Sequence, residues 1–189
     1  MQDIIELDQY LIRRKIFKFL GASFHVFDGD QIVAYTKQKA FKLKEDIRIY
    51  TGEDMQTELL TIRARNVIDF AASYDIVDAR EGTKVGAARR KGFASIVRDS
   101  WELLDREDRP IGKLQEDSTG MALLRRFLSN LIPQSFHLDS GGRQPVELKQ
   151  HFNPFVYRLA VSIPSDATID RRLVLGVSAL IAAIEGCQD

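Results

Sequence analysis

The chain has 189 residues, in which 27 lysines and arginines balance 27 aspartates and glutamates. Zero net charge excludes a global field that would draw the protein to nucleic acid or to an anionic membrane, so such binding would need a local patch. The length suits one domain over residues 1–189. A single cysteine excludes an internal disulfide, and the first residues lack the apolar stretch of a signal peptide, so we expect a cytoplasmic protein.

Short strands separated by turn signals fill the first third of the chain. Asp28-Gly29-Asp30 lies between two apolar runs, a pattern typical of a β-hairpin. A second turn is predicted at Thr51-Gly52-Glu53-Asp54. In the strand after it, side chains alternate, so Arg63 and Arg65 share the face opposite Ile62. We predict strands over residues 10–19, 24–27, 32–36, 40–44, 46–50 and 59–65.

The middle of the chain repeats this pattern and adds one helix. Turns at Arg80-Glu81-Gly82 and at residues 106–110 each separate two predicted strands. Residues 121–128 switch to the helical spacing of apolar side chains, and this segment ends before Pro133. The predicted strands of this part and of the part that follows span residues 73–78, 84–90, 101–105, 111–114, 135–138, 146–149 and 155–163.

The last predicted element, residues 173–184, is apolar on every side when it is wound as a helix. Such a helix must be buried all round, and its length of about 18 Å is too short for roughly 30 Å of bilayer hydrocarbon. Arg171 and Arg172 lie in its first turn, where the helix dipole disfavours cations. We therefore expect groups outside the helix to neutralise them. Candidate N-cap residues are Ser165, Asp166, Thr168 and Asp170.

The number of strands and the buried helix together favour one architecture. Many short strands with turn signals every eight to twelve residues indicate a sandwich or a barrel. A closed barrel leaves no open edge and can surround a helix. We therefore predict a mainly β (α+β) fold, a closed antiparallel barrel of about twelve strands enclosing a buried hydrophobic C-terminal helix.

A family resemblance is carried by six segments in a fixed order, which span residues 10–17, 24–28, 40–43, 74–91, 101–114 and 170–175. The order and spacing of these segments resemble those of the tubby C-terminal-like superfamily, in particular its LURP-one-related and phospholipid-scramblase-like branch. The resemblance extends from about residue 10 to residue 185. The resemblance implies a twelve-stranded barrel around a buried C-terminal helix, in agreement with the reading from periodicity. It also implies a ligand, because tubby domains bind phosphoinositide head groups. The chain differs from animal scramblases in lacking a cysteine cluster and a calcium-loop spacing before the last helix.

Patterns of catalytic and metal-binding residues are missing from the sequence. The three histidines, His25, His137 and His151, have no metal-ligand spacing, although His137 and Asp139 can share one strand face. Residues 82–86 have the wrong order for a phosphate loop, and there is no nucleophile elbow. We expect no enzyme activity, no cofactor and no catalytic metal.

Basic side chains give the functional hypothesis. If they converge, they can hold phosphate groups by charge-assisted hydrogen bonds; the alternative is solvated faces balanced by nearby carboxylates. One interpretation is a non-catalytic module that binds phosphoinositide or another anionic ligand, peripherally at a membrane surface. A regulatory or scaffold protein with a protein partner is the second interpretation, and an enzyme or scramblase is the third; nucleic acid is disfavoured because aromatic residues do not interleave with the basic ones. The candidate anion patch comprises Arg63, Arg65, Arg89, Arg90, Lys91, Arg125 and Arg126.

Overall fold

The computed structural model describes residues 4–15, 22–38, 46–65, 72–90, 100–116, 133–139, 142–153 and 155–185. Within these residues the chain forms twelve strands, the helix α2 (Arg171–Glu185) and a 3₁₀ turn, η1 (Ile4–Glu6). The strands are β1 (Gln9–Lys15), β2 (Ala22–Asp28), β3 (Gln31–Gln38), β4 (Ile47–Tyr50), β5 (Glu58–Ala64), β6 (Ser73–Asp78), β7 (Thr83–Arg90), β8 (Ser100–Leu104), β9 (Pro110–Glu116), β10 (Ser135–Leu138), β11 (Val146–Gln150) and β12 (Arg158–Ser162).

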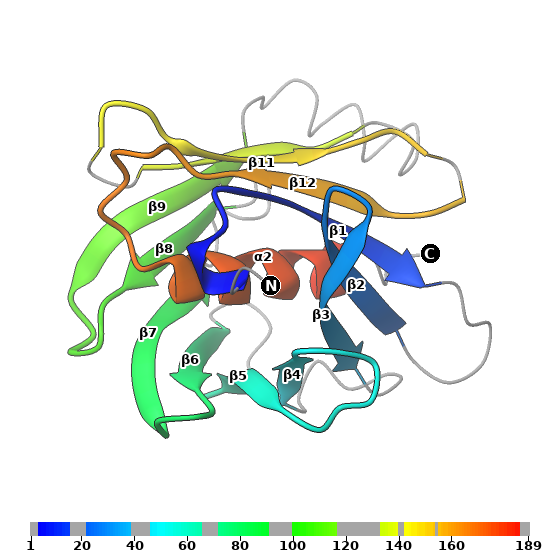
Figure 1. Cartoon of the computed structure of the whole chain (residues 1–189). Helices are drawn as coiled ribbons and strands as arrows, with labels where there is room; N and C mark the ends of the chain where they lie inside the picture. Colours follow the sequence, from blue (N-terminus) through cyan, green and yellow to red (C-terminus); the bar gives the residue numbers. More distant parts are fainter. Residues whose placement is uncertain are drawn as a thin grey trace.

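The strands form a closed barrel in which each strand pairs antiparallel with its neighbours in the sequence, and β1 pairs with β12 to close the ring. The closing ladder runs from Gln9 opposite Ser162 to Arg13 opposite Arg158. Figure 1 shows β11 and β12 on one side of α2 and β5 to β7 on the other. The predicted closed barrel around a C-terminal helix is confirmed, and closure leaves no open strand edge.

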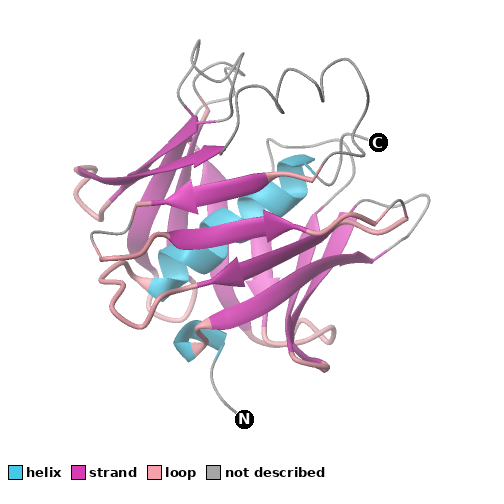
Figure 2. Ribbon diagram, turned by 90° about the horizontal axis from the view of Figure 1, so that it is seen from above, coloured by secondary structure: helices cyan, strands magenta, loops and turns pink. Residues whose placement is uncertain are grey.

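Helix α2 runs through the interior of the barrel, behind the strands in the view of Figure 2. All residues from Leu173 to Ala183 are buried, as the apolar surface of the helix predicted. Asp170 is the N-cap: its Oδ1 accepts the N–H of Arg172 at 2.9 Å, and its carbonyl accepts the N–H of Val174 at 3.2 Å. Each larger aliphatic side chain buried here contributes roughly 1.5–3 kcal/mol, so the helix is a main source of the barrel's stability.

The helix approaches the barrel wall most closely at Gly176. A Cβ added to this glycine would lie 2.8 Å from Cγ2 and 3.0 Å from Cγ1 of Ile76 on β6. Ile76 is fully buried and branched at Cβ, so it cannot swing away from such a group. The one residue without a side chain in this helix therefore sets the distance between α2 and β6.

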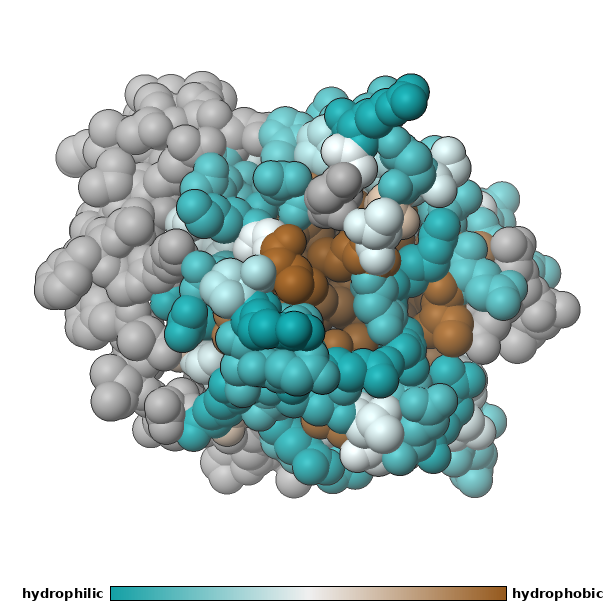
Figure 3. Space-filling model, turned by 90° about the vertical axis from the view of Figure 1, so that its left-hand side faces the viewer, coloured by the Kyte–Doolittle hydropathy of each residue, from teal (hydrophilic) through white to brown (hydrophobic). Residues whose placement is uncertain are grey.

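The end of the barrel where α2 begins holds Arg171 against the N-terminal segment. Its Nη1 donates to the Leu7 carbonyl at 2.9 Å and lies 2.5 Å from Asp8 Oδ1. Figure 3 views this end of the molecule and shows apolar side chains gathered in a recess within a polar rim. The first-turn cation is thus neutralised from outside the helix, as expected.

Arg172, the second first-turn cation, joins the helix to β6. Its Nη2 lies 2.8 Å from Asp170 Oδ2, and its Nη1 donates to Asp78 Oδ2 at 3.0 Å. Asp78 is fully buried and its Oδ1 also accepts the backbone N–H groups of Arg80 and Glu81. Burial would raise the pKa of Asp78, but the hydrogen bonds from Arg172, Arg80 and Glu81 outweigh it and hold the pKa below its usual value. The carboxylate is therefore charged and fully engaged.

One predicted strand is clearly shorter in the structure, and two predicted elements lie outside the described residues. The predicted strand 155–163 is ordered as a strand only from Arg158 to Ser162. Asn153 Oδ1 accepts the N–H groups of Phe155 and Val156, so these donors are satisfied locally instead of by a neighbouring strand. η1 was not predicted. The strand predicted over residues 40–44 and the helix predicted over residues 121–128 lie in parts of the chain that the structure does not describe.

Candidate functional site

The first part of the predicted anion patch, Arg63 and Arg65, points outward at the end of β5. Ile62 beside them is buried in the barrel, so the predicted alternation of side chains is confirmed. Arg63 Nε lies 3.7 Å from Asp46 Oδ2, and both side chains are exposed. This is a loose pair at the surface, of a kind that contributes about 0–1 kcal/mol.

Arg65 belongs to a tighter network. Its Nη2 lies 2.5 Å from Asp75 Oδ1 on β6 and 2.5 Å from Asp108 Oδ1 in the β8–β9 turn. Lys84 Nζ lies 2.6 Å from the same Asp108 oxygen. The hydrogen bonds from Arg65 and Lys84 lower the pKa of Asp108 to about 2, and the bond that Arg65 donates to Asp75 raises the pKa of Arg65. Two cations share two carboxylates here.

The other predicted residues divide between the described and undescribed parts of the chain. Arg89 on β7 donates through Nε and Nη2 to Glu102 Oε2 on β8. The Arg90 guanidinium lies 5.9 Å from the centre of the Trp101 ring. Arg63, Arg65 and Arg89 thus each face a carboxylate, whereas anion binding by the patch stays a prediction. Lys91, Arg125 and Arg126 lie outside the described residues.

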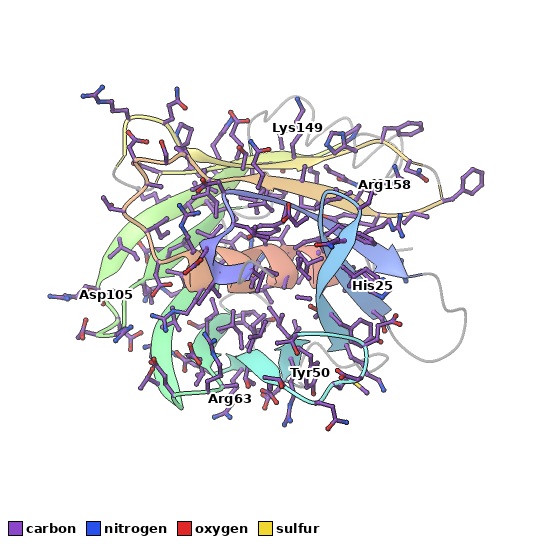
Figure 4. All side chains as sticks on the ribbon, viewed as in Figure 1. His25, Tyr50, Arg63, Asp105, Lys149 and Arg158 are labelled. Carbon is purple, nitrogen blue, oxygen red and sulfur yellow. The ribbon has the colours of Figure 1, made fainter. Side chains whose placement is uncertain are left out.

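A different pair of arginines meets on the opposite side of the barrel. Arg13 on β1 and Arg158 on β12 lie directly opposite each other in the closing ladder. Both point outward and are half-buried, because Ile12 and Leu159 beside them face the core. Among the described residues neither arginine makes an ion pair, and Arg158 Nε is buried without a hydrogen-bond partner. Figure 4 shows Arg158 near Lys149, with Arg63 across the molecule beyond α2.

Aromatic side chains form a second layer outside the barrel next to Arg13. The rings of Phe27 and Tyr35 pack against His25, with centres 5.9 Å and 5.4 Å from the imidazole. The Arg13 guanidinium carbon lies 4.4 Å from the centre of the Phe27 ring, a cation–π geometry. His25 Nε2 lies 2.5 Å from Glu53 Oε1. The Arg13 guanidinium thus lies against Phe27, which is itself held by the contact with His25.

A groove of about 420 Å³ crosses the outer surface of β2, β1, β12 and β11. The small side chains of Ala160 and Ser162 on β12 lie between larger ones: Lys149 is opposite Ala160, and Glu147 is opposite Ser162. We call this surface, with the bordering residues Arg13 and Arg158, the groove face. One end of the groove carries the cations and the other end the carboxylates. The lining residues are Gln9, Tyr10, Leu11, Phe27, Asp28, Gly29, Glu147, Lys149, His151, Ala160, Val161 and Ser162.

A second hollow of about 790 Å³ lies outside β9 and β10, and its charges are mixed. Lys113 and Arg143 line it together with the Asp139 carboxylate. His137, which also lines it, has its Nε2 3.6 Å from Glu147 Oε1. His137 and Asp139 both line this hollow, and Asp139 follows directly after β10. Carboxylates thus lie beside cations in both hollows, and the groove face differs in being bordered by Arg13 and Arg158, which make no ion pair among the described residues.

The family is decided by a comparison of the sequence with family models. The model described as LURP-one-related matches residues 32–182. The chain belongs to the LURP-one-related family. Searches of curated proteins and of solved structures found no match for this LURP-one-related chain. The groove face joins matched and unmatched residues, because Arg13 precedes the matched range and Arg158 lies within it.

In this LURP-one-related chain the sequence predicted the outward direction of strand arginines but not which of them meet. Arg63 and Arg65 are adjacent in one strand, so alternation alone places them together. Arg13 and Arg158 meet only through the register of the first strand against the last. The sequence does show a basic residue at an outward position in each of the first and last strands, which must pair when the barrel closes. It does not predict the register of that pairing.

In the part of this LURP-one-related chain that the structure describes, no group of three or more histidine, cysteine, aspartate or glutamate side chains has a metal-binding arrangement. No helix in this part has both the length and the apolar character needed to cross a bilayer.

Proposed function

We propose that this LURP-one-related chain is a non-catalytic module that binds an anionic, phosphate-bearing ligand on the groove face. Arg13, Arg158 and Lys149 are the cations that would contact it. The observation that carries the proposal is the facing pair of arginines, which has no carboxylate partner in the described part of the chain. The patch on β5 to β7 is less suited, because Arg63, Arg65 and Arg89 face carboxylates.

Electrostatics favour a bound anion between the two arginines. Like charges directly opposite each other on neighbouring strands destabilise a sheet. A buried N–H without a partner, such as Arg158 Nε, adds a desolvation cost. A phosphate group between the guanidinium groups would remove both penalties, since its oxygens accept several charge-assisted hydrogen bonds from the planar donors of arginine.

The size and chemistry of the groove favour a small phosphorylated head group. Its volume of about 420 Å³ lies within the range of small-ligand sites. Lys149 can contact a second anionic group, while Glu147 and Ser162 further along the groove can accept hydrogen bonds from hydroxyl groups. The resemblance to tubby domains, which bind phosphoinositide head groups, agrees with a ligand that carries both phosphates and hydroxyls.

A titration with soluble inositol trisphosphate tests the proposal. We expect binding that weakens when salt is raised, because partly exposed charges are screened. Arg13→Gln with Arg158→Gln should weaken binding at least about tenfold, since each charge-assisted hydrogen bond contributes more than a neutral one. Isothermal calorimetry at two salt concentrations measures both effects.

The matched control is Arg63→Gln with Arg65→Gln, which removes two outward arginines from the opposite side of the barrel. It should leave the affinity unchanged while both double variants keep the unfolding cooperativity of the unaltered protein. Loss of binding in this control alone would move the site to the patch on β5 to β7. Absence of binding by the unaltered protein at low salt would contradict the proposed function and favour a role through a protein partner.

A further inference from the structure

The loop between β11 and β12 exposes two phenylalanines. Phe155 is 81% exposed and Phe152 is 60% exposed, whereas Ile32, the next large apolar side chain in the described part of the chain, is 46% exposed. Single exposed apolar residues are normal on a protein surface. Two exposed phenylalanines in one short loop are a concentrated apolar feature, and such features mark interaction sites.

Hydrogen bonds within the loop hold the backbone that presents these rings. Asn153 Oδ1 accepts the N–H of Phe155 at 2.9 Å and the N–H of Val156 at 3.0 Å. At the base of the loop, the His151 N–H donates to the Arg158 carbonyl at 3.0 Å. These three backbone donors are satisfied in a conformation that leaves both rings exposed, so the rings are available to a partner in this loop conformation.

Cations surround the base of this loop. Lys149 lies near the end of β11, Arg158 begins β12, and Arg13 is opposite Arg158 on β1. Figure 1 shows that the β11–β12 loop lies at the end of the barrel where β1 also ends, and Figure 4 shows Lys149 and Arg158 on the strands that lead into it. Exposed apolar rings with cations at the base of the same loop fit an anionic lipid surface. The rings would lie among the acyl chains and the cations among the head groups.

We propose that the β11–β12 loop is a membrane anchor that inserts Phe152 and Phe155 into an anionic bilayer while the groove face binds a lipid phosphate. This inference rests on the proposed function and names a lipid head group within a bilayer as the source of the phosphate. A weak electrostatic contact and a shallow apolar insertion are each insufficient for stable attachment, but they add when they act on one surface. Two rings on a projecting loop do not provide the broad apolar area of a stable protein interface.

Binding to vesicles separates this anchor from the phosphate site. The probes are vesicles of phosphatidylcholine with phosphatidylserine and phosphatidylinositol bisphosphate, and soluble inositol trisphosphate. Phe152→Ser with Phe155→Ser should weaken vesicle binding about tenfold or more, because aromatic area would no longer leave water, and should leave inositol trisphosphate binding unchanged. Arg13→Gln with Arg158→Gln should weaken both. The control, Ile111→Ser, removes an exposed apolar side chain from β9, away from the groove face, and should change neither.

Insertion itself is measured with Phe155→Trp and vesicles that carry brominated acyl chains. The added tryptophan should be quenched, whereas Trp101, which is 1% exposed, should not be. Vesicle binding without this quenching, or vesicle binding by the phenylalanine variant equal to that of the unaltered protein, would overturn the anchor. If the unaltered protein bound inositol trisphosphate but no vesicle, the anchor would fall and the proposed function would stand. If it bound neither, both would fall.

Discussion

At the scale of single residues, the decisive difference among the arginines is whether a carboxylate accompanies them. Arg172 is the extreme case, since it connects the N-cap Asp170 to the fully buried Asp78 across the end of the barrel. A buried ion pair stabilises little compared with an apolar pair of the same shape, but the loss of one partner leaves an uncompensated charge. Arg172 therefore holds the helix in place because any movement that separated it from Asp78 would leave a buried charge without its closest side-chain partner.

Arg172→Met should lower the free energy of unfolding by about 3 kcal/mol, because Asp78 would stay buried and charged with only the longer 3.6 Å contact to Arg80 as a side-chain partner. Adding Asp78→Asn should restore part of this loss, since the double variant buries no unpaired charge. Urea denaturation of the two single variants and the double variant measures the coupling. Arg63→Met, which removes one loose surface pair, is the control and should change the stability by less than about 1 kcal/mol.

The same cluster makes a contribution that depends on pH. The folded-state pKa values of Asp78 and Asp170 lie below their ordinary values. Their stabilisation is therefore fully present above the unfolded aspartate pKa of about 3.9 and is lost as the pH falls through the folded values. The double variant should lose less stability on acidification below about pH 4 than the unaltered protein does. An equal acid loss in both proteins would contradict the assignment of Asp78.

At the scale of elements, local patterns predicted most strands, and side-chain competition explains the misplaced boundary. Hairpins such as Asp28-Gly29-Asp30 form between sequence neighbours, so periodicity and turn residues suffice. Residues 155–157 have strand-like composition, yet Asn153 satisfies the donors of Phe155 and Val156 within the loop. Residues 155–157 of the β11–β12 loop are therefore predicted as strand, because a side-chain turn is weakly marked in sequence.

Gly176→Ala tests how closely α2 and β6 are packed. Alanine favours a helix over glycine by about 1 kcal/mol, but its methyl group would lie 2.8 Å from Cγ2 of Ile76. Overpacking costs typically about 1–3 kcal/mol, so we expect a net loss of about 1 kcal/mol in thermal or urea unfolding. In an Ile76→Ala background the same substitution should instead stabilise, because the methyl group enters the space left by the isoleucine. A stabilising effect in the unaltered background would show that the wall yields at this point.

At the scale of the whole molecule, the closure of the barrel was predictable, but the meeting of Arg13 and Arg158 that results from it was not. The strand pattern together with the need to bury the helix and remove open edges predicted a barrel. Pairing Arg13 with Arg158 depends on the register between the two ends of the barrel, and a shift of either strand by one residue would turn the arginine of that strand inward. The candidate site therefore emerges only from the assembled molecule, whereas the patch on β5 to β7 was visible within single strands.

Because strands and helix share one hydrophobic core, damage at the centre of α2 should unfold the barrel as well. Leu180 is fully buried in the same core cluster as Trp101 of β8. Leu180→Asp would bury an unpaired carboxylate at a cost of several kcal/mol, a large share of the roughly 5–15 kcal/mol that stabilises a typical domain.

Trp101, the single tryptophan of the chain, reports on the barrel wall rather than on the helix. We expect its fluorescence to shift to the red without denaturant in this variant, whereas Leu180→Met, which conserves volume, should lose less than about 1.5 kcal/mol and keep the buried emission. Buried Trp101 emission in Leu180→Asp, with cooperative unfolding near that of the unaltered protein, would show that the barrel stands without a packed helix.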